Sequence, residues 1–394
     1  MEKKYITYSC LTVFLLFFYS YCEAKSLNLK RANKTLDYTY GRYGIEGSNL
    51  LRETYPFDEK HKATYLANTD LAEQPNQYSY LWPYSGSLSA VTALYGATHN
   101  SKYKKLLDLK VLPGLEEYLD NKREPYAYAS YVNTAPLSDR FYDDNIWIGI
   151  DFTDLYRLTG DKRLLDKALL IWNFIESGKD DLLRGGVYWC EQNKNGKNTC
   201  SNAPAAVYAL KLFEATNDSS FFFRGKELYD WVKTNLQDTT DYLYFDNINV
   251  NGNVDKAKYA YNSGQMLQSA SLLYKLTNNP LYLKDAQNIA SSAYLYFFHD
   301  FNAKNGKSFK LLNKGNVWFT AVMLRGYIEL YNIDKDNEYI NAFRKNLDYA
   351  WKHMRDKKSG LFNSDWSGET KDHSKWLLTQ LAMVEMYSRI SKLN

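Results

Sequence analysis

Two aspartates stand side by side at Asp143 and Asp144, inside the segment FYDDNIWIGIDF of residues 141–152. A single aspartate at a helix start is explained by capping and by the helix dipole, each worth roughly 0.5–2 kcal/mol. A second aspartate crowds like charge, which raises one pKa and suits an acid next to a base or a nucleophile. We therefore weigh two interpretations of the segment: a helix cap with a spare charge, and a catalytic pair.

The spacing of the two aspartates limits which glycosidase mechanism they can serve. The Cα atoms of consecutive residues are about 3.8 Å apart, so a carboxyl separation near 5 Å is easily reached. Inverting glycosidases need roughly 6.5–9.5 Å, which is near the limit for neighbours, whereas retaining enzymes use about 5 Å. Adjacent residues do not share a helix face, so the two carboxyl groups could flank one scissile bond. The pair predicts a retaining glycosidase in which the two residues divide the nucleophile and acid/base roles.

Other reaction classes lack their residues. The five histidines form no HExxH motif and no i,i+4 pair, and the sequence has no Walker loop, no GxGxxG and no GxSxG. Lys plus Arg at 49 against Asp plus Glu at 45 leaves a net charge of +4 without a basic stripe, so we expect no nucleic acid partner. We also expect no metal site and no cofactor.

A recurring phrase indicates the elements that must position the pair. It joins an apolar and an aromatic residue to a turn rich in Thr, Asn, Asp or Gly, and consecutive copies are 56–61 residues apart. The copies align on Leu94, Leu155, Leu212, Leu273, Leu330 and, more weakly, Met386. Apolar residues before and after each copy are spaced as in helices, so each unit is predicted to be a helical hairpin.

Six hairpins in series must stack, because one hairpin cannot bury its faces alone. They could form an open solenoid or close into a ring. The count of six and the aromatic-rich helices favour the closed all-α toroid, an (α/α)6 barrel, as a single domain over residues 25–394. The last unit lacks a following helix, so we expect residues 31–44 to pack against it and close the ring.

The helices that end at the recurring phrase should all begin along one rim of this barrel. Their starts and the neighbouring loops carry aromatic and amide side chains, and three tryptophans at helix starts have no use as caps. The chain holds 36 Tyr and 9 Trp, a surplus that suits stacking against sugars. We therefore expect a groove for a neutral, hydroxyl-rich polymer, with substrate-binding residues Trp82, Tyr84, Tyr142, Tyr188, Trp189, Asn202, Tyr261, Asn262, Gln265, Trp318, Asp365 and Trp366.

The N-terminus has the pattern of an export signal. Lys3 and Lys4 precede an apolar run over residues 11–18, and a cleavage site follows near Ala24. We expect residues 1–24 to be a signal peptide and the mature protein to be periplasmic, secreted or held at the cell surface. Cys22 is an alternative lipid anchor. No later run is long enough to span a membrane, and we expect a monomer.

Two cysteines, Cys190 and Cys200, lie in the body of the chain. An even pair in an oxidising compartment is most simply a disulfide, here one that closes the loop CEQNKNGKNTC.

Three segments together strongly resemble glycoside hydrolase family 76, the endo-α-1,6-mannanases: FYDDNIWIGIDF, GGVYWC with CSNAPAAVYALKLF, and YNSGQMLQSASLLYKLT. The resemblance runs from about residue 33 to the end of the chain. It implies an (α/α)6 barrel that hydrolyses internal α-1,6-mannosidic bonds of mannan with retention of configuration. By match to the family motif, Asp143 would be the nucleophile and Asp144 the general acid/base. The residues themselves indicate a polymer, and mannose rests on the resemblance.

Two other functions stay open at this point. The chain could be a transglycosylase that passes the glycosyl-enzyme to another sugar. It could also be a binding protein that keeps the groove without turnover, although the intact pair of Asp143 and Asp144 argues against this.

Overall fold

The structure is a computed structural model that describes residues 26–63, 66, 76–304 and 306–393. The predicted export signal of residues 1–24, with Cys22, lies outside the described residues. Among the described helices, none has the length and apolar character that crossing a membrane requires.

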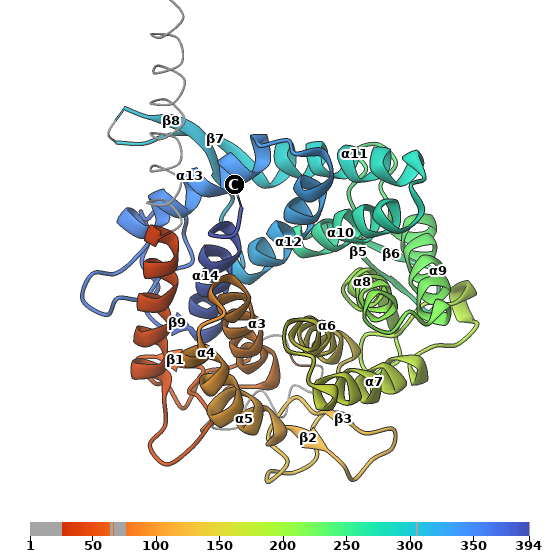
Figure 1. The fold of residues 1–394 in the computed structure, drawn as a ribbon, viewed down its shortest axis with the longest axis horizontal. Helices are drawn as coiled ribbons and strands as arrows, with labels where there is room; N and C mark the ends of the chain where they lie inside the picture. The colour runs from red at the N-terminus through yellow and green to blue at the C-terminus, as the bar shows by residue number, and fades with distance from the viewer. Residues whose placement is uncertain (1–25, 64–65, 67–75, 305, 394) are drawn as a thin grey trace, which may run out of the picture.

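Within these residues, six helices form an inner ring (Figure 1). Each packs against the next, and the last packs against the first, so the ring is closed. The inner helices are α3 (Leu81–Thr98), α6 (Tyr142–Thr159), α8 (Thr199–Thr216), α10 (Ala260–Thr277), α12 (Val317–Asp334) and α14 (Leu377–Ile390). Most of their residues are buried on every side, as expected for helices enclosed by others. The predicted (α/α)6 barrel is confirmed, and contact between α14 and α3 excludes the open solenoid.

An outer layer of helices surrounds the ring (Figure 1). Helices α7 and α13 of this layer bury one face and expose the other. The outer elements are the helix of residues 26–43, the segment α4 (Ser101–Leu106) to α5 (Leu112–Glu116) joined by the π-helical turn Leu107–Val111, and α7 (Lys162–Ser177), α9 (Ser219–Leu236), α11 (Pro280–Phe297) and α13 (Glu338–His353).

The N-terminal helix completes the outer layer beside α14. Its Arg31 lies over the ring of Tyr387 in α14, 5.8 Å from the ring centroid, and pairs with Asp348 of α13 at 2.5 Å. On its other side, Asn33 accepts a hydrogen bond from Tyr103 of α4 at 2.9 Å. The expectation that this segment closes the ring is confirmed.

The recurring phrase of the sequence is the turn from an inner to an outer helix. Five inner helices end in a left-handed residue whose N–H bonds the carbonyl of the phrase's aromatic residue four positions earlier. These caps are His99, Gly160, Asn217, Asn278 and Lys335. An Asn or Asp then caps four outer helices by accepting from a backbone N–H, namely Asn100, Asp161, Asp218 and Asn279. The phrase therefore repeats because the same reversal is needed at each hairpin.

Short antiparallel strands connect outer helices to the next inner helices. One sheet has three strands in the order β4 (Gly196–Asn198), β5 (Phe245–Asn249) and β6 (Val254–Lys258). The two-stranded sheets pair β1 (Thr54–Tyr55) with β9 (Lys375–Trp376), β2 (Leu119–Asp120) with β3 (Ala127–Tyr128), and β7 (Phe298–Asn302) with β8 (Ser308–Leu312).

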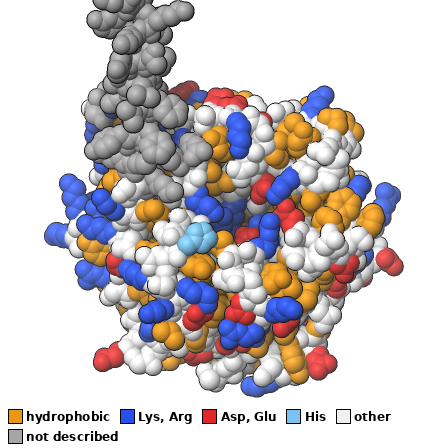
Figure 2. All heavy atoms as spheres, viewed as in Figure 1, with side chains coloured by type: hydrophobic (Ala, Val, Ile, Leu, Met, Phe, Trp, Pro, Cys, Tyr) orange, Lys and Arg blue, Asp and Glu red, His pale blue; other side chains and the backbone are white. Residues whose placement is uncertain are grey.

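The ring also holds buried charges. Arg325 of α12 forms a two-pronged ion pair with Glu385 of α14 at 2.7 and 2.9 Å, and the two side chains are 3% and 1% exposed. Arg389 bonds the same carboxylate. Nearby, burial raises the pKa of Asp151 to about 6, and Ser89 donates a hydrogen bond to it. On the face shown in Figure 2, basic and acidic side chains intermingle and form no broad patch of one sign.

Candidate active site

The second residues of the inner helices meet at one rim of the barrel. In α3, α6, α8, α10 and α12 this position is occupied by Trp82, Asp143, Cys200, Tyr261 and Trp318, and all five line the same cavity. In α14 the position holds a leucine. The near-equal repeat length places equivalent residues around one ring, which confirms that the helix starts share a rim.

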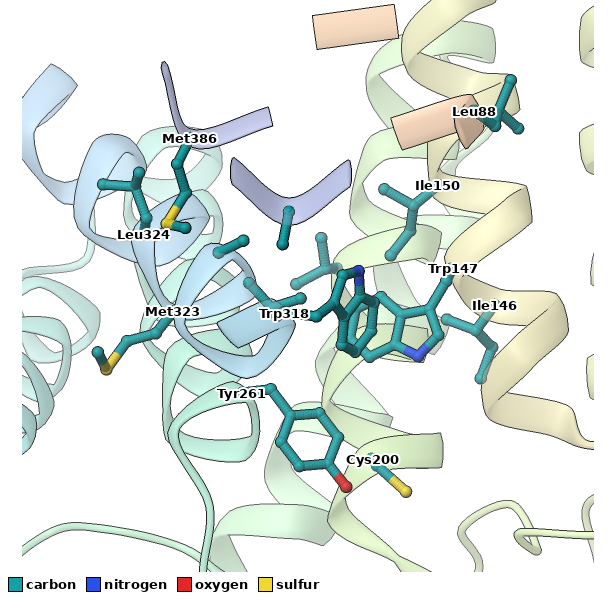
Figure 3. Packing of buried hydrophobic residues seen from close by; sticks show 14 of the residues in the cluster. Leu88, Ile146, Trp147, Ile150, Cys200, Tyr261, Trp318, Met323, Leu324 and Met386 are labelled. Atoms are coloured by element: carbon teal, nitrogen blue, oxygen red, sulfur yellow. The ribbon is translucent and has the colours of Figure 1, made fainter. Parts of the chain in front are cut away.

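The cavity has a volume of about 670 Å³. This lies within the range of roughly 300–1,000 Å³ that is typical of ligand sites. Asp143 and Asp144 both line it, together with aromatic side chains and a group of asparagines. Figure 3 shows the side chains of Trp147, Trp318, Tyr261 and Cys200 close to one another.

Neither aspartate is the N-cap of α6. Phe141 occupies the N-cap position, and its side chain cannot accept a hydrogen bond from the helix. Both aspartates lie in the first turn. Outer helices do use Asp caps, as Asp161 and Asp218 show. The interpretation of the pair as a simple cap is therefore wrong, although the helix dipole still favours negative charge there.

The carboxyl group of Asp143 is held on one side. Its Oδ2 accepts a hydrogen bond of 3.1 Å from the indole Nε1 of Trp189, and the thiol of Cys200 adjoins the same carboxyl group in the cavity lining. Its Oδ1 is buried and has no hydrogen-bond partner among the described residues. Burial raises the pKa of Asp143 to about 7, while Cys200 and Trp189 oppose that rise.

Asp144 holds its proton more tightly. Burial raises the pKa of Asp144 well above its usual range, and the neighbouring charge of Asp143 raises it further. The two carboxyl groups thus differ, since hydrogen-bond donors favour the ionised form of Asp143 alone. The arrangement pairs a carboxyl group that releases its proton first with one that keeps its proton longer, which is the pairing that acid and nucleophile chemistry requires.

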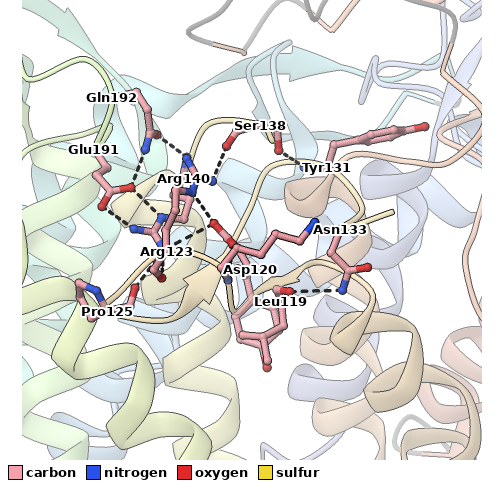
Figure 4. A network of polar contacts seen from close by, with 12 residues as sticks. Leu119, Asp120, Arg123, Pro125, Tyr131, Asn133, Ser138, Arg140, Glu191 and Gln192 are labelled. Atoms are coloured by element: carbon pink, nitrogen blue, oxygen red, sulfur yellow. Dashed lines mark hydrogen bonds and ion pairs between the residues drawn. The ribbon is translucent and has the colours of Figure 1, made fainter. Parts of the chain in front are cut away.

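A salt-bridged loop fixes the start of α6 (Figure 4). Arg140, two residues before the helix and 1% exposed, forms a two-pronged ion pair with Glu191 at 2.5 and 2.6 Å. Its Nη1 also bonds the carbonyls of Arg123 and Pro125, at 2.9 Å each. The backbone N–H of Tyr142 bonds the carbonyl of Trp189, so the segment that carries this indole is tied to the helix carrying Asp143.

Aromatic rings form one wall of the cavity. Tyr261 stacks on Phe319 with ring centroids 3.9 Å apart, and Trp82 stacks on the same ring at 6.1 Å. Trp318 meets Trp147 edge to face at 4.9 Å. Trp147 is one helical turn after Asp143, so both face the cavity from α6. Phe319, Trp147 and Tyr259 line the cavity but were absent from the predicted set.

Asparagines form a second wall on the sheet of β4 and β5. Asn198 pairs with Asn247 across the two strands, and Gly196 pairs with Asn249. All four residues line the cavity, together with Asn193 and Asn195 from the preceding loop. We call this surface the amide wall. Sequence analysis missed it, although five asparagines within the two polar segments at 193–198 and 247–249 were a usable signal.

A third carboxyl group, Asp246, also lines the cavity. It accepts hydrogen bonds from Asn247 at 2.9 Å and from Asn262 at 3.3 Å, and burial raises its pKa. The prediction had named Asn262 but not Asp246. Asn262 is fully buried and donates to this carboxyl group, while its own Oδ1 has no hydrogen-bond partner within the described part of the chain.

Four predicted substrate-binding residues line the cavity: Trp82, Trp189, Tyr261 and Trp318. Three predicted tyrosines instead belong to the scaffold. The hydroxyl of Tyr84 bonds backbone carbonyls, the ring of Tyr142 stacks on Phe174 at 4.6 Å, and Tyr188 bonds Asp180 at 2.7 Å. We correct their assignment accordingly, because their positions on the helix or loop turn them away from the cavity.

The remaining predicted residues also lie outside the cavity lining. Asn202 is fully buried and ties the start of α8 to the backbone of Val187, and Gln265 bonds Gln268 at 2.9 Å. Asp365 closes its own loop by accepting from Ser367 and Thr370, and Trp366 is only 1% exposed. We reassign these residues, too, to the scaffold.

The predicted disulfide is wrong, because Cys190 and Cys200 are free thiols. The sulfur of Cys190 lies 4.0 Å from Gln192 Oε1, whereas the side chain of Cys200 lines the cavity beside Asp143 and Tyr261. The two thiols thus have different surroundings. Across the described residues, no group of three or more His, Cys, Asp or Glu side chains could hold a metal ion.

Comparison with known proteins identifies relatives of the whole barrel. Residues 57–392 match the profile of Glycosyl hydrolase family 76. The structure of a family 76 glycoside hydrolase (mannosidase) from Bacteroides thetaiotaomicron is 33% identical, with a TM-score of 0.84. That match covers 93% of this chain and 98% of the other.

Two more distant relatives carry mannan-related names. A Salegentibacter α-1,6-mannanase, solved with α-1,6-mannotriose as an inactive variant in which two adjacent aspartates are replaced by asparagine, is 24% identical. Its TM-score is 0.74, and the match covers 93% of this chain and 100% of the other. A Schizosaccharomyces pombe protein provisionally named mannan endo-1,6-alpha-mannosidase is 25% identical over 238 residues, 56% of this chain and 51% of the relative. The match thus spans about half the length of that curated relative. Since the family profile covers most of the barrel, and the Bacteroides structure nearly all of it, the chain belongs to glycosyl hydrolase family 76.

Proposed function

We propose that this chain is a retaining, endo-acting glycoside hydrolase that cleaves α-1,6-mannosidic bonds of mannan. The observation that carries the proposal is the pair of unequal carboxyl groups in the cavity, Asp143 as the more acidic and Asp144 as the less acidic. Adjacent residues favour the shorter carboxyl separation, about 5 Å, on which retaining enzymes rely.

In the first step, a carboxylate oxygen of Asp143 attacks the anomeric carbon of the sugar whose bond is cut. Asp144 gives its proton to the glycosidic oxygen as the bond from that oxygen to the anomeric carbon breaks. The leaving sugar departs as an alcohol, and a mannosyl ester of Asp143 remains. The Trp189 N–H holds the other carboxylate oxygen and so orients the nucleophile.

In the second step, Asp144 is a carboxylate and accepts a proton from water. The water oxygen attacks the anomeric carbon, and the ester bond to Asp143 breaks. Two inversions at one carbon give net retention. The proton returned to Asp144 restores the starting state, so the pair needs no further acid or base.

The walls of the cavity support a neutral sugar polymer as substrate. The amide wall offers donors and acceptors without charge, and the rings of Trp82, Tyr261 and Phe319 offer apolar faces to sugar rings. The names of the relatives support mannose and the α-1,6 bond. The loss of activity when two adjacent aspartates are replaced in the Salegentibacter enzyme supports the role of this pair.

An exported location would suit this function, because a polysaccharide meets its hydrolase outside the cytoplasm. We therefore propose that residues 1–24 direct export.

The first experiment resolves the products of linear α-1,6-mannan by chromatography. We expect a mixed series of oligosaccharides early in the reaction, and none with Asp143→Asn or Asp144→Asn. Asp300→Asn is a matched control, since this side chain is 90% exposed on the β7–β8 hairpin and should leave turnover unchanged. Release of free mannose or mannobiose alone would contradict endo action, and full activity of Asp143→Asn would contradict the mechanism. Redistribution of short oligosaccharides into longer ones would instead indicate a transglycosylase.

A second experiment separates the two roles. Azide is supplied to alanine variants with a dinitrophenyl α-mannoside, whose leaving group needs no acid. Asp144→Ala should give the α-mannosyl azide, because azide attacks the ester on Asp143. Asp143→Ala should give the β-mannosyl azide, because azide displaces the leaving group directly. The opposite pair of products would exchange the assigned roles.

A further inference from the structure

Cys200 occupies a position in the active-site ring that the reaction does not use. It is the second residue of α8, between α6 with Asp143 and α10 with Tyr261, and these three inner helices pack side by side. The three side chains line the cavity together, and Cys200 is 3% exposed. In Figure 3 the hydroxyl end of Tyr261 points toward the sulfur of Cys200.

The thiol of Cys200 lies between two polar groups of the cavity. It adjoins the carboxyl group of Asp143, whose pKa it lowers, and the hydroxyl of Tyr261 adjoins the sulfur. The Trp189 indole donates a hydrogen bond to the same carboxyl group at 3.1 Å. Asp143 therefore has a thiol from the next inner helix and an indole from the loop before that helix as its neighbours.

We propose that the Cys200 thiol accepts a hydrogen bond from the Tyr261 hydroxyl and donates one to Asp143, and that Cys200 is thereby a positioning residue that holds the Asp143 carboxylate in its attacking orientation. The inference rests on the proposed role of Asp143 as nucleophile. In this proposal the sulfur has no part in bond making and acts through Asp143.

A thiol suits this place because it stays neutral. Burial first, and then the charges of Asp143 and Asp246, raise the pKa of Cys200 well above its usual range. A protonated thiol donates a hydrogen bond, whereas a thiolate would repel the carboxylate. The charged or titratable groups facing Asp143 are Asp144 on its own helix, Cys200 on α8 and Cys190 on the preceding loop, and Asp246 and Tyr261 face the thiol.

The test measures the pKa of Asp143 directly. Aspartate labelled with carbon-13 at the side-chain carboxyl is followed by NMR across a pH titration, and Asp143→Asn identifies the resonance. We expect Cys200→Ala to raise the pKa of Asp143 by about 0.5–1, the worth of one lost hydrogen bond. Cys200→Ser should restore most of the difference because the hydroxyl still donates. Asp300→Asn, which removes an exposed charge on the β7–β8 hairpin, should leave the pKa of Asp143 unchanged.

Turnover provides a second readout. The acidic limb of kcat/KM on α-1,6-mannotetraose should move to higher pH in Cys200→Ala by the same amount, with activity above the limb retained. Tyr261→Phe keeps the ring stacked on Phe319 but removes the donor to sulfur, so the limb should move in the same direction by less. If Cys200→Ala does not fold, Tyr261→Phe is used for the test instead.

An unchanged Asp143 pKa in Cys200→Ala would overturn the inference, and so would an equal rise in Cys200→Ser, which would indicate packing rather than donation. The NMR titration does not depend on turnover. A wild-type protein that leaves mannan intact would therefore refute the proposed function, while the titration would still decide the role of Cys200.

Discussion

Burial of Asp143 should lower the stability of the folded protein at neutral pH, and Asp143→Asn should restore that stability. The pKa of Asp143 is about 7 in the folded protein against 3.8 for an ordinary aspartate, because burial disfavours its charge. Between pH 4 and 7 the folded state therefore binds more protons than the unfolded chain. Stability falls as pH rises through this window, and the loss is complete above pH 7. Because asparagine cannot ionise, the Asp143→Asn variant does not lose this stability as the pH rises.

The magnitude follows from the difference in pKa. A pKa about three units higher in the folded state corresponds to about 4 kcal/mol above pH 7. For a chain of 394 residues the unfolding entropy is roughly 0.8 kcal/mol per degree, so Asp143→Asn should raise Tm by about 5 °C at pH 8. At pH 4 the two proteins should differ little, because both carry a neutral side chain that accepts from Trp189.

Differential scanning calorimetry at pH 4 and pH 8 would measure both differences. Asp300→Asn is the control for loss of a negative charge at an exposed site, and its Tm change should be small and independent of pH. A Tm at pH 8 equal to or below that of the wild type would refute the reasoning. It would mean that the ionised Asp143 is better solvated or better bonded than its burial indicates.

Three further substitutions test other parts of the structure. Trp189→Phe keeps an aromatic ring but removes the 3.1 Å hydrogen bond to Asp143, so the acidic limb of kcat/KM should move up by about 1–2 pH units, as measured on α-1,6-mannotetraose. Arg325→Met should lower stability by about 3 kcal/mol in urea unfolding, because it leaves Glu385 buried with one fewer partner. Gly264→Ala should lower Tm by several degrees, because a Cβ atom would lie 2.4 Å from the backbone of Met323 where α10 and α12 pack closely.

For each of these three predictions, a specific result would contradict it. A pH profile of Trp189→Phe that overlays the wild type would show that the indole does not bond the ionised carboxylate. The double substitution of Arg325 and Glu385 by Met should recover much of the lost stability, and a further loss would contradict the view that the single variant strands a charge. Unchanged thermal unfolding of Gly264→Ala would show that the inner helices can separate without cost.

The architecture was predictable because its signals are local. Each copy of the recurring phrase encodes a helix end, a left-handed residue and an Asn or Asp cap, all within a few residues. Helical spacing on both sides and a nearly constant repeat length then leave few ways to bury six hairpins. The rim of helix starts follows from the same repeat, which is why Trp82, Asp143, Tyr261 and Trp318 could be grouped before their contacts were known.

The wrongly predicted substrate-binding residues were placed in the right part of the fold, but the direction of their side chains was not foreseen. Successive residues of a helix point about 100° apart, so Tyr142 faces the outer helix α7 while its neighbour Asp143 faces the cavity. Trp82 and Tyr84 on α3 differ in the same way. A residue's place at a helix start is read from sequence, but the rotation of that helix about its axis is set by packing against both neighbours.

The sequence by itself determined the closed ring of hairpins, the rim that holds the site and the adjacency of Asp143 and Asp144. Only the tertiary structure decided what surrounds that pair. Cys200 was paired with Cys190 on grounds of number and spacing, yet its thiol lies beside Asp143 because α8 is the inner neighbour of α6. The amide wall and Asp246 likewise reach the cavity through strand pairing over some fifty residues. Contacts between segments far apart in the chain have no local signature, since they depend on how separate elements pack.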